Sequence, residues 1–368
     1  MNYAAAALAG LAMTTGLAQA GGIDRSNTPF ILFEKGRVLQ LGYSNVTPTV
    51  SGTFNHPQAG LLSTKDMAEN YNTLSLAYKA DLSDKLSYAI ILNQPYGADA
   101  LYTAFYTGLE AHWDSNQLAA LIKYKATDRV SVYGGLRYVR SNAEIFIPRS
   151  LFGGSANVLG DYTASADTDG QVGYILGVAY EIPDIALRVG LSYESEITHS
   201  FATSEQFSVL NGGATLNSTT EIILPQSVTL DFQSGVAKDT LVFGSIRWAE
   251  WSKWHVRPSY YDQVINDEVT GFDNDVITYQ LGVGRRLNEN LSVFARIAYE
   301  KANGGVASRL SPTDGSRSIA IGGSYTMDNM KITGGIEYAE LGDAVDGTGV
   351  QFEDNKAVGV GFAVQFSF

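Results

Sequence analysis

The chain has 368 residues and no cysteine, which excludes disulfides, metal thiolates and thiol nucleophiles. Its net charge of −13 argues against nucleic-acid binding, which needs a basic surface. After the first 20 residues no stretch of about 18 uninterrupted apolar residues occurs, so a helical membrane protein is not expected. The 38 glycines and 21 tyrosines suit a transmembrane β-barrel, where glycine fits crowded strands and tyrosine fits the membrane interface.

The first 20 residues have the pattern of an export signal. Residues 4–17 are small and apolar, and Ala18-Gln19-Ala20 forms an A-x-A cleavage site. The start lacks the lysine or arginine of an ordinary signal peptide, so an alanine-rich terminal helix is the alternative. We predict a signal peptide over residues 1–20, a short plug over 21–35, and a barrel over 36–368.

From residue 36 the chain repeats segments of about ten residues with period-two alternation, which is typical of membrane-barrel strands. Six short polar turns alternate strictly with seven long stretches. The turns lie at 81–85, 126–129, 181–185, 237–240, 286–290 and 327–329, and the long stretches lie at 47–69, 94–116, 143–169, 200–225, 251–275, 302–315 and 341–355. This alternation predicts an all-β fold, a 14-stranded antiparallel transmembrane barrel with both termini in the periplasm.

The last strand has the clearest split between two faces. From Val358 to Phe368 every second residue is large and apolar, and the residues between them are small or polar. We expect the apolar face to meet outer-membrane lipid and lipopolysaccharide. The terminal Phe368 resembles the signal by which the barrel-assembly machinery recognises bacterial outer-membrane barrels.

Several segments resemble the FadL-type outer-membrane transporters of long-chain fatty acids and other hydrophobic compounds. They are LPQSVTL at 224–230, IRWAEWS at 246–252, GGIDRS at 21–26 and NQPYGA at 93–98. The resemblance covers the mature chain and implies a monomeric, outer-membrane transporter of 14 strands that releases substrate sideways through its wall. One departure is the plug: that family has roughly forty residues there, whereas here only 21–35 precede the barrel, with Asn27-Thr28-Pro29 as a partial echo of its Asn-Pro-Ala motif.

The segment that resembles the family's kinked third strand contains the residues for a lateral opening. Pro95 lacks an N–H and leaves one ladder bond unmade, and Gly97 permits a bend. We therefore expect an opening at Asn93, Pro95, Tyr96 and Gly97. The alternative is that Pro95 simply ends the strand at the extracellular rim.

Two long stretches, 143–169 and 200–225, are unusually apolar for wet loops. The resemblance implies that they capture the substrate first, which makes Phe146, Phe152, Phe201 and Phe207 candidate ligand contacts. The alternative is that they pack on one another as a lid.

A fatty acid also needs an apolar groove with one cation for its carboxylate. Strand parity places arginines and aromatic residues together on the inner face, at Arg137, Phe243, Arg247, Trp251, Phe294 and Arg296. For each arginine an ion pair with a residue such as Glu194, Glu300 or Glu337 is an equal alternative.

Enzymatic signals are weak, and no cofactor is expected. The four histidines, His56, His112, His199 and His255, are far apart in sequence, so no metal-site spacing appears. Two other functions stay open: a general diffusion porin, which would have polar loops, and a lipid-modifying enzyme, which needs a Ser–His pair near the rim.

Overall fold

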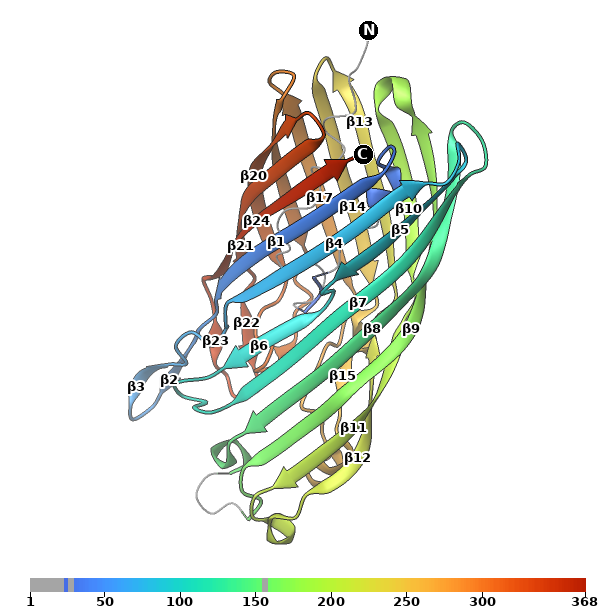
Figure 1. Cartoon of the computed structure of the whole chain (residues 1–368). Coiled ribbons are helices and arrows are strands. Elements are labelled where there is room, and N and C mark those ends of the chain that lie inside the picture. Colours follow the sequence, from blue (N-terminus) through green and yellow to red (C-terminus); the bar gives the residue numbers. More distant parts are fainter. Residues whose placement is uncertain (1–22, 26–29, 154–157) are drawn as a thin grey trace.

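A computed structural model describes residues 23–25, 30–153 and 158–368. They form a closed 14-stranded antiparallel barrel (Figure 1), as the alternating turn lengths predict. The ring closes where β1 (Val38–Thr49) pairs along its length with β24 (Asn355–Ser367). The predicted signal peptide, residues 1–20, lies outside the described residues.

Most strands of the barrel are continuous. Besides β1 and β24 these are β4 (Tyr71–Asp81), β7 (Glu110–Lys125), β8 (Val130–Ile147), β9 (Tyr162–Ile182), β14 (Thr240–Ala249), β17 (Val276–Arg286), β18 (Leu291–Glu300), β20 (Ser316–Met327) and β21 (Met330–Leu341). Three are broken in two: β5 (Leu86–Asn93) with β6 (Gly97–Leu101), β10 (Leu187–Glu194) with β11 (Ile197–Phe207), and β12 (Leu216–Leu224) with β13 (Ser227–Ala237).

The six short turns gather at one end of the barrel, where β1 also begins and β24 ends (Figure 1). The long connections lie at the other end. Membrane barrels keep short turns in the periplasm, so the long connections are extracellular. No described helix is both long and apolar enough to cross a membrane.

The long connections carry short elements of their own. They are β2 (Gly52–His56), β3 (Gly60–Ser63), β15 (His255–Val256), β16 (Thr270–Gly271), β19 (Val306–Ala307), β22 (Ala344–Asp346), β23 (Gln351–Phe352), η3 (Arg149–Phe152), η6 (Leu210–Gly213), η7 (Trp251–Lys253) and α1 (Ser259–Ile265). Two further single turns are η2 (Phe30–Phe33), before β1, and η5 (Pro183–Ile185), in a short turn.

The predicted loops 143–169 and 200–225 need correction, because strands extend far into both of them. β9 pairs with β11 as far as Tyr162 opposite Phe207, so the wall continues well into the predicted loops. In β11 inward residues are buried and alternate with exposed ones such as Ser200 and Ser204. Above the membrane the outer face of the wall meets water, so the outward residues of the strand are polar there. The sequence of this part of the strand therefore resembles that of a loop.

The two faces of the wall differ as parity predicts. Outward Leu118, Ile122, Leu136 and Val172 are exposed, whereas inward Arg137, Arg247 and Arg296 are buried. Apolar groups meet lipid and charges face the lumen, because a charge in the hydrocarbon of the membrane is costly.

Candidate functional site

The wall is interrupted between β4 and the β5–β6 strand. β4 pairs with β5 as far as Leu76 opposite Leu92, and β6 then pairs with β7. In the described part of the chain, residues 72–75 of β4 have no register partner in β5 or β6. Figure 1 shows β5 and β6 as separate arrows on the front wall. The strand therefore continues past Pro95 with a kink instead of ending there.

Two backbone N–H groups at this break donate to side chains, and a bond between two side chains lies beside them. The Leu74 N–H donates to Gln94 Oε1 at 3.0 Å, and the Tyr96 N–H donates to Ser115 Oγ at 2.8 Å. The Gln117 amide donates to Asn93 Oδ1 at 2.9 Å. Because buried backbone groups need partners, these bonds make the break a fixed feature of the wall.

The N-terminal residues 23–25 pair with the break. The Arg25 N–H donates to the Pro95 carbonyl at 2.6 Å, and the Gly97 N–H donates to the Ile23 carbonyl at 3.0 Å. The Arg25 guanidinium lies 3.6 Å from the centroid of the Tyr71 ring. Burial lowers the pKa of Arg25, and the neighbouring Tyr71 and Asp99 oppose this shift. A Cβ on Gly97 would lie 2.3 Å from the Arg25 guanidinium, so glycine makes room for it.

Four buried charged residues form what we call the central ion cluster: Asp24, Arg137, Glu194 and Arg247. Arg247 lies 2.8 Å from Asp24 and 4.0 Å from Glu194, and Arg137 lies 2.8 Å from Glu194.

The cluster contacts all three strand breaks. Arg137 donates to the Ser195 carbonyl at 2.8 Å and reaches the Tyr96 hydroxyl at 3.5 Å. Arg247 donates to Ser227 Oγ at 2.8 Å. Charges and broken strands therefore meet at one level of the lumen.

The three predicted arginines all have protein carboxylate partners. Besides Arg137 and Arg247, Arg296 lies 2.7 Å from Glu337. The ion-pair alternative describes this geometry, because a buried guanidinium without a counter-charge would be strongly destabilising. That one of them binds a ligand carboxylate stays a prediction.

The described residues enclose cavities in the lumen, of which two bear on the site. The larger, about 450 Å³, borders the break at Tyr71 and Gly97 and extends across to β17–β21. The smaller, about 80 Å³, is lined mainly by apolar side chains, including Trp113, Ile222 and Trp254. Ile23 and Phe272 line both, so the N-terminal segment stands between them.

Most of the predicted contact residues pack elsewhere. Phe152 lies 5.7 Å from the ring of Phe207, as the lid alternative describes, and Phe201 lies 5.6 Å from Trp113. Trp251 packs 6.3 Å from Tyr96. Phe146, by parity, is on the outward face of β8.

The two remaining aromatic candidates cover glycines of the neighbouring strands: Phe243 lies over Gly282, and Phe294 lies over Gly322.

Of all the predicted site residues, only Gly97 lines one of these two cavities. The prediction missed Trp113, although its parity on β7 places it inward. It also missed Phe272 and Trp254, which lie in an irregular connection where no periodicity applies.

A Ser–His–Asp chain does occur inside the wall. Ser141 Oγ lies 3.1 Å from His199 Nε2, and His199 Nδ1 lies 2.8 Å from Asp169. Ser141 is buried and lines neither cavity, and the ring of Phe201 stacks on His199 at 5.0 Å. A nucleophile must reach its substrate, so this chain is better explained as a link between β8, β9 and β11.

Comparisons with known proteins agree with this architecture. Residues 2–345 match the family described as outer membrane protein transport protein (OMPP1/FadL/TodX). A Pseudomonas aeruginosa FadL homologue is similar in structure, with 14% identity, a TM-score of 0.72, and coverage of 97% of this chain and 99% of that one. The toluene transporter TodX of Pseudomonas putida has 16% identity and a TM-score of 0.65, with 95% and 96% coverage.

The toluene transporter TbuX of Ralstonia pickettii is also similar, with 14% identity, a TM-score of 0.65 and 100% coverage of both chains. A comparison with curated protein sequences gave no match. At such identities the solved structures support the fold alone, whereas the family match spans most of the chain.

Proposed function

Since the chain belongs to the outer membrane transport proteins of the OmpP1/FadL/TodX family, and so is a transport barrel and not an enzyme, we propose that it passes hydrophobic molecules sideways into the outer membrane. One observation carries this proposal: a cavity of about 450 Å³ borders a break in the wall at which two backbone N–H groups donate to side chains. Side-chain acceptors of this kind lower the cost of facing backbone donors toward lipid at a gap.

Thermodynamics favours a sideways exit for this class of substrate. Each methylene gains about 0.8 kcal/mol on leaving water for hydrocarbon. A molecule released into the periplasm forfeits that gain, whereas one released into the bilayer keeps it. A sugar or an ion gains nothing from such a route.

The ion pairs of the lumen favour neutral substrates. The sequence predicts long-chain fatty acids, but a fatty-acid carboxylate would have to displace Asp24, Glu194 or Glu337 from an arginine. A neutral aromatic hydrocarbon has no such requirement and suits the apolar lining of the smaller cavity. Two of the similar structures are named as toluene transporters. We therefore place neutral hydrocarbons before fatty acids.

We infer that residues 21–35 act as a short plug. Residues 23–25 pair with the wall break, and Ile31 and Leu32 are buried near the short-turn end. Phe33 lies 5.7 Å from Tyr133 and beneath the guanidinium of Arg188 at 4.5 Å. A segment of this length can thus contact both the proposed exit and the periplasmic end.

The aromatic cluster of Phe152, Phe207 and Tyr261 supports a role for the extracellular end in first capture. These rings pack on one another, and Val158 and Val209 nearby are exposed. Exposed apolar groups beside a packed lid could hold a hydrophobic molecule before it enters.

Uptake measurements test the proposal. Cells carrying the barrel should take up toluene faster than cells without it, and planar bilayers containing the purified barrel should pass little ion current. Large, steady currents without hydrophobic uptake would instead identify a general diffusion porin. Oleate uptake measured in the same cells ranks fatty acids against hydrocarbons.

A further inference from the structure

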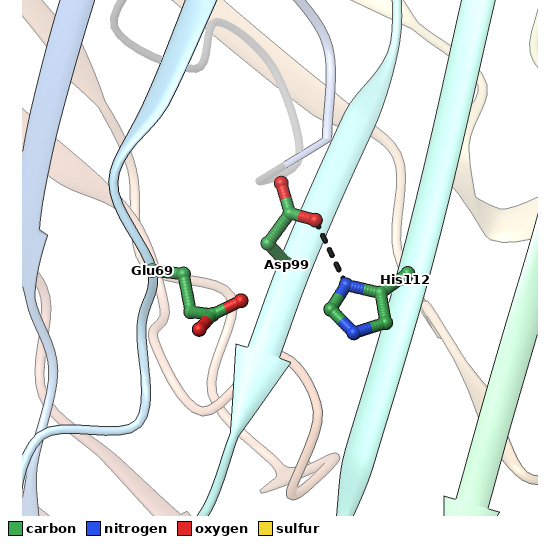
Figure 2. Close-up of side chains that lie close together, drawn as sticks. All are labelled: Glu69, Asp99 and His112. Carbon is green, nitrogen blue, oxygen red and sulfur yellow. Dashed lines mark hydrogen bonds and ion pairs between the residues drawn. The ribbon is translucent and has the colours of Figure 1, made fainter.

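Three side chains that commonly bind metals meet beside the wall break (Figure 2). One ligand atom from each of Glu69, Asp99 and His112 lies within 4.8 Å of the others. Glu69 precedes β4, Asp99 is on β6, and His112 is on β7, directly opposite Asp99 in the register. Because the residues come from three segments, sequence spacing shows no such site, and the sequence predicts none.

The cluster lies at the wall break and borders the cavities: Glu69 and Asp99 line the larger one, and His112 lines the smaller one. On β7 the buried residues Trp113 and Ser115 face inward, and the exposed Asp114 and Leu118 face outward. His112 shares the parity of Asp114 and Leu118, and its side chain is 33% exposed. His112 is therefore on the outward face of β7 and partly exposed, and none of the three residues belongs to the central ion cluster.

The hydrogen bonds of His112 suit a metal ligand. Its Nδ1 lies 3.0 Å from Asp99, on the side where Figure 2 also shows Glu69, and its Nε2 lies 2.7 Å from Glu110. Metal-ligating histidines almost always donate their second ring N–H to a carboxylate or a carbonyl, which orients the ring. Glu110 supplies that second contact, independently of the three ligand atoms.

The charges around the cluster also favour a cation. Glu69, Asp99, Glu110 and Asp114 are carboxylates, and Asp114 is opposite Gly97 in the register. The nearby positive group is Arg25, whose guanidinium lies 3.8 Å from Asp99. The carboxylates outnumber this charge, so the local potential is negative.

We propose that Glu69, Asp99 and His112 bind a divalent first-row transition ion, for which Zn²⁺ is the probe. One imidazole and two carboxylates suit metal ions of intermediate hardness, such as Zn²⁺. Ca²⁺ and Mg²⁺ instead prefer sites made of oxygen ligands alone. Ligand atoms bound about 2.0–2.2 Å from a zinc ion lie closer to one another than they do in the present cluster. Rotation of the exposed Glu69 side chain can bring its carboxylate nearer to Asp99 and His112.

A bound ion would tie the segment before β4 to β6 and β7. Because these strands border the break, the bound ion would hold the extracellular end of the break in one position. The binding site itself rests on the ligand geometry and holds whether or not substrate passes through the gap.

The test is Zn²⁺ titration of the detergent-solubilised barrel by calorimetry, with Co²⁺ absorption as a second readout and Ca²⁺ for comparison. We expect one saturable Zn²⁺ site and much weaker Ca²⁺ binding. His112→Gln and Glu69→Gln should weaken binding by more than tenfold, and Glu110→Gln by about 10–100-fold. Heat-modifiable migration on gels checks that each variant folds, and Glu69 is exposed enough for its variant to remain folded.

His255→Gln is the matched control. Its imidazole also lies 2.7 Å from a carboxylate, that of Glu268, but no three-residue ligand group among the described residues includes it. This variant should bind Zn²⁺ like the parent. Absence of saturable binding, unchanged binding in both Glu69→Gln and His112→Gln, or loss of binding in His255→Gln would each overturn the proposal.

Discussion

The Asp24 carboxylate lies 2.8 Å from the Arg247 guanidinium, although 223 residues separate them in sequence. Both are buried, and the same guanidinium donates to Ser227, next to another strand break. This pair fastens the N-terminal segment to β14 while residues 23 and 25 bond to the kinked strand. The segment therefore joins the proposed exit to the far side of the lumen.

The first prediction concerns the strength of this pair. Asp24→Asn and Arg247→Met should each lower the free energy of unfolding by about 3 kcal/mol, because each removes the nearest counter-charge of a buried charged group. The double variant should lose less than the sum, with a coupling of roughly 1–3 kcal/mol in urea unfolding. The exposed pair Arg317 and Glu340 is the control, and its removal should cost about 1 kcal/mol or less. If the losses of unfolding free energy in the two single variants simply add in the double variant, Asp24 and Arg247 are not a coupled ion pair.

The second prediction concerns Gly97. Gly97→Ala should displace the flexible Arg25 side chain from Tyr71 without unfolding the barrel, because the clash is with the end of a side chain. Loss of the cation–π contact, about 1 kcal/mol, should speed trypsin cleavage after Arg25 roughly fivefold.

Gly135→Ala is the contrast, because its Cβ would lie 1.9 Å from the Ala120 carbonyl oxygen. That backbone cannot move aside, so this variant should fail to assemble. Equal protection of Arg25 in Gly97→Ala and the parent would show that the glycine serves another purpose.

The third prediction separates structural from ligand-binding arginines. Arg296→Met with Glu337→Met removes a buried pair together and avoids an isolated charge. We expect the affinity of this double variant for a fatty acid to stay within about twofold of the parent. An arginine that is already paired with a protein carboxylate contributes little to the binding of a ligand carboxylate. A loss of more than tenfold would restore Arg296 as the cation for a carboxylate substrate.

The strand count follows from the sequence because it depends on local features. Period-two alternation and short polar turns are properties of neighbouring residues, and they place the six turns correctly. Pro95 likewise indicates the first break, since a missing N–H is visible in the sequence. The break at Ser195 has no such signal, and Pro225 reads as the start of a strand instead of a break within one.

The contacts inside the lumen could not be predicted in the same way. Parity correctly turns Arg137, Arg247 and Arg296 inward, but it cannot choose their partners across the barrel. Asp24 pairs with Arg247 only because the N-terminal segment folds back into the lumen. The cavity residues Phe272 and Trp254 lie in a connection without periodicity, so only the folded chain brings them together.

Closing the wall break tests the central claim, lateral release, most directly. Leu74→Cys with Gln94→Cys places two thiols across the gap, in a chain that otherwise has no cysteine. Leu281→Cys with Ile297→Cys, opposite each other on β17 and β18, gives a matched disulfide elsewhere in the wall. We predict that oxidation of the first pair stops toluene uptake by intact cells and that reduction restores it, while the second pair has no effect. Equal uptake by the oxidised and reduced forms of a folded, fully crosslinked first variant would contradict lateral release and favour a route straight through the lumen.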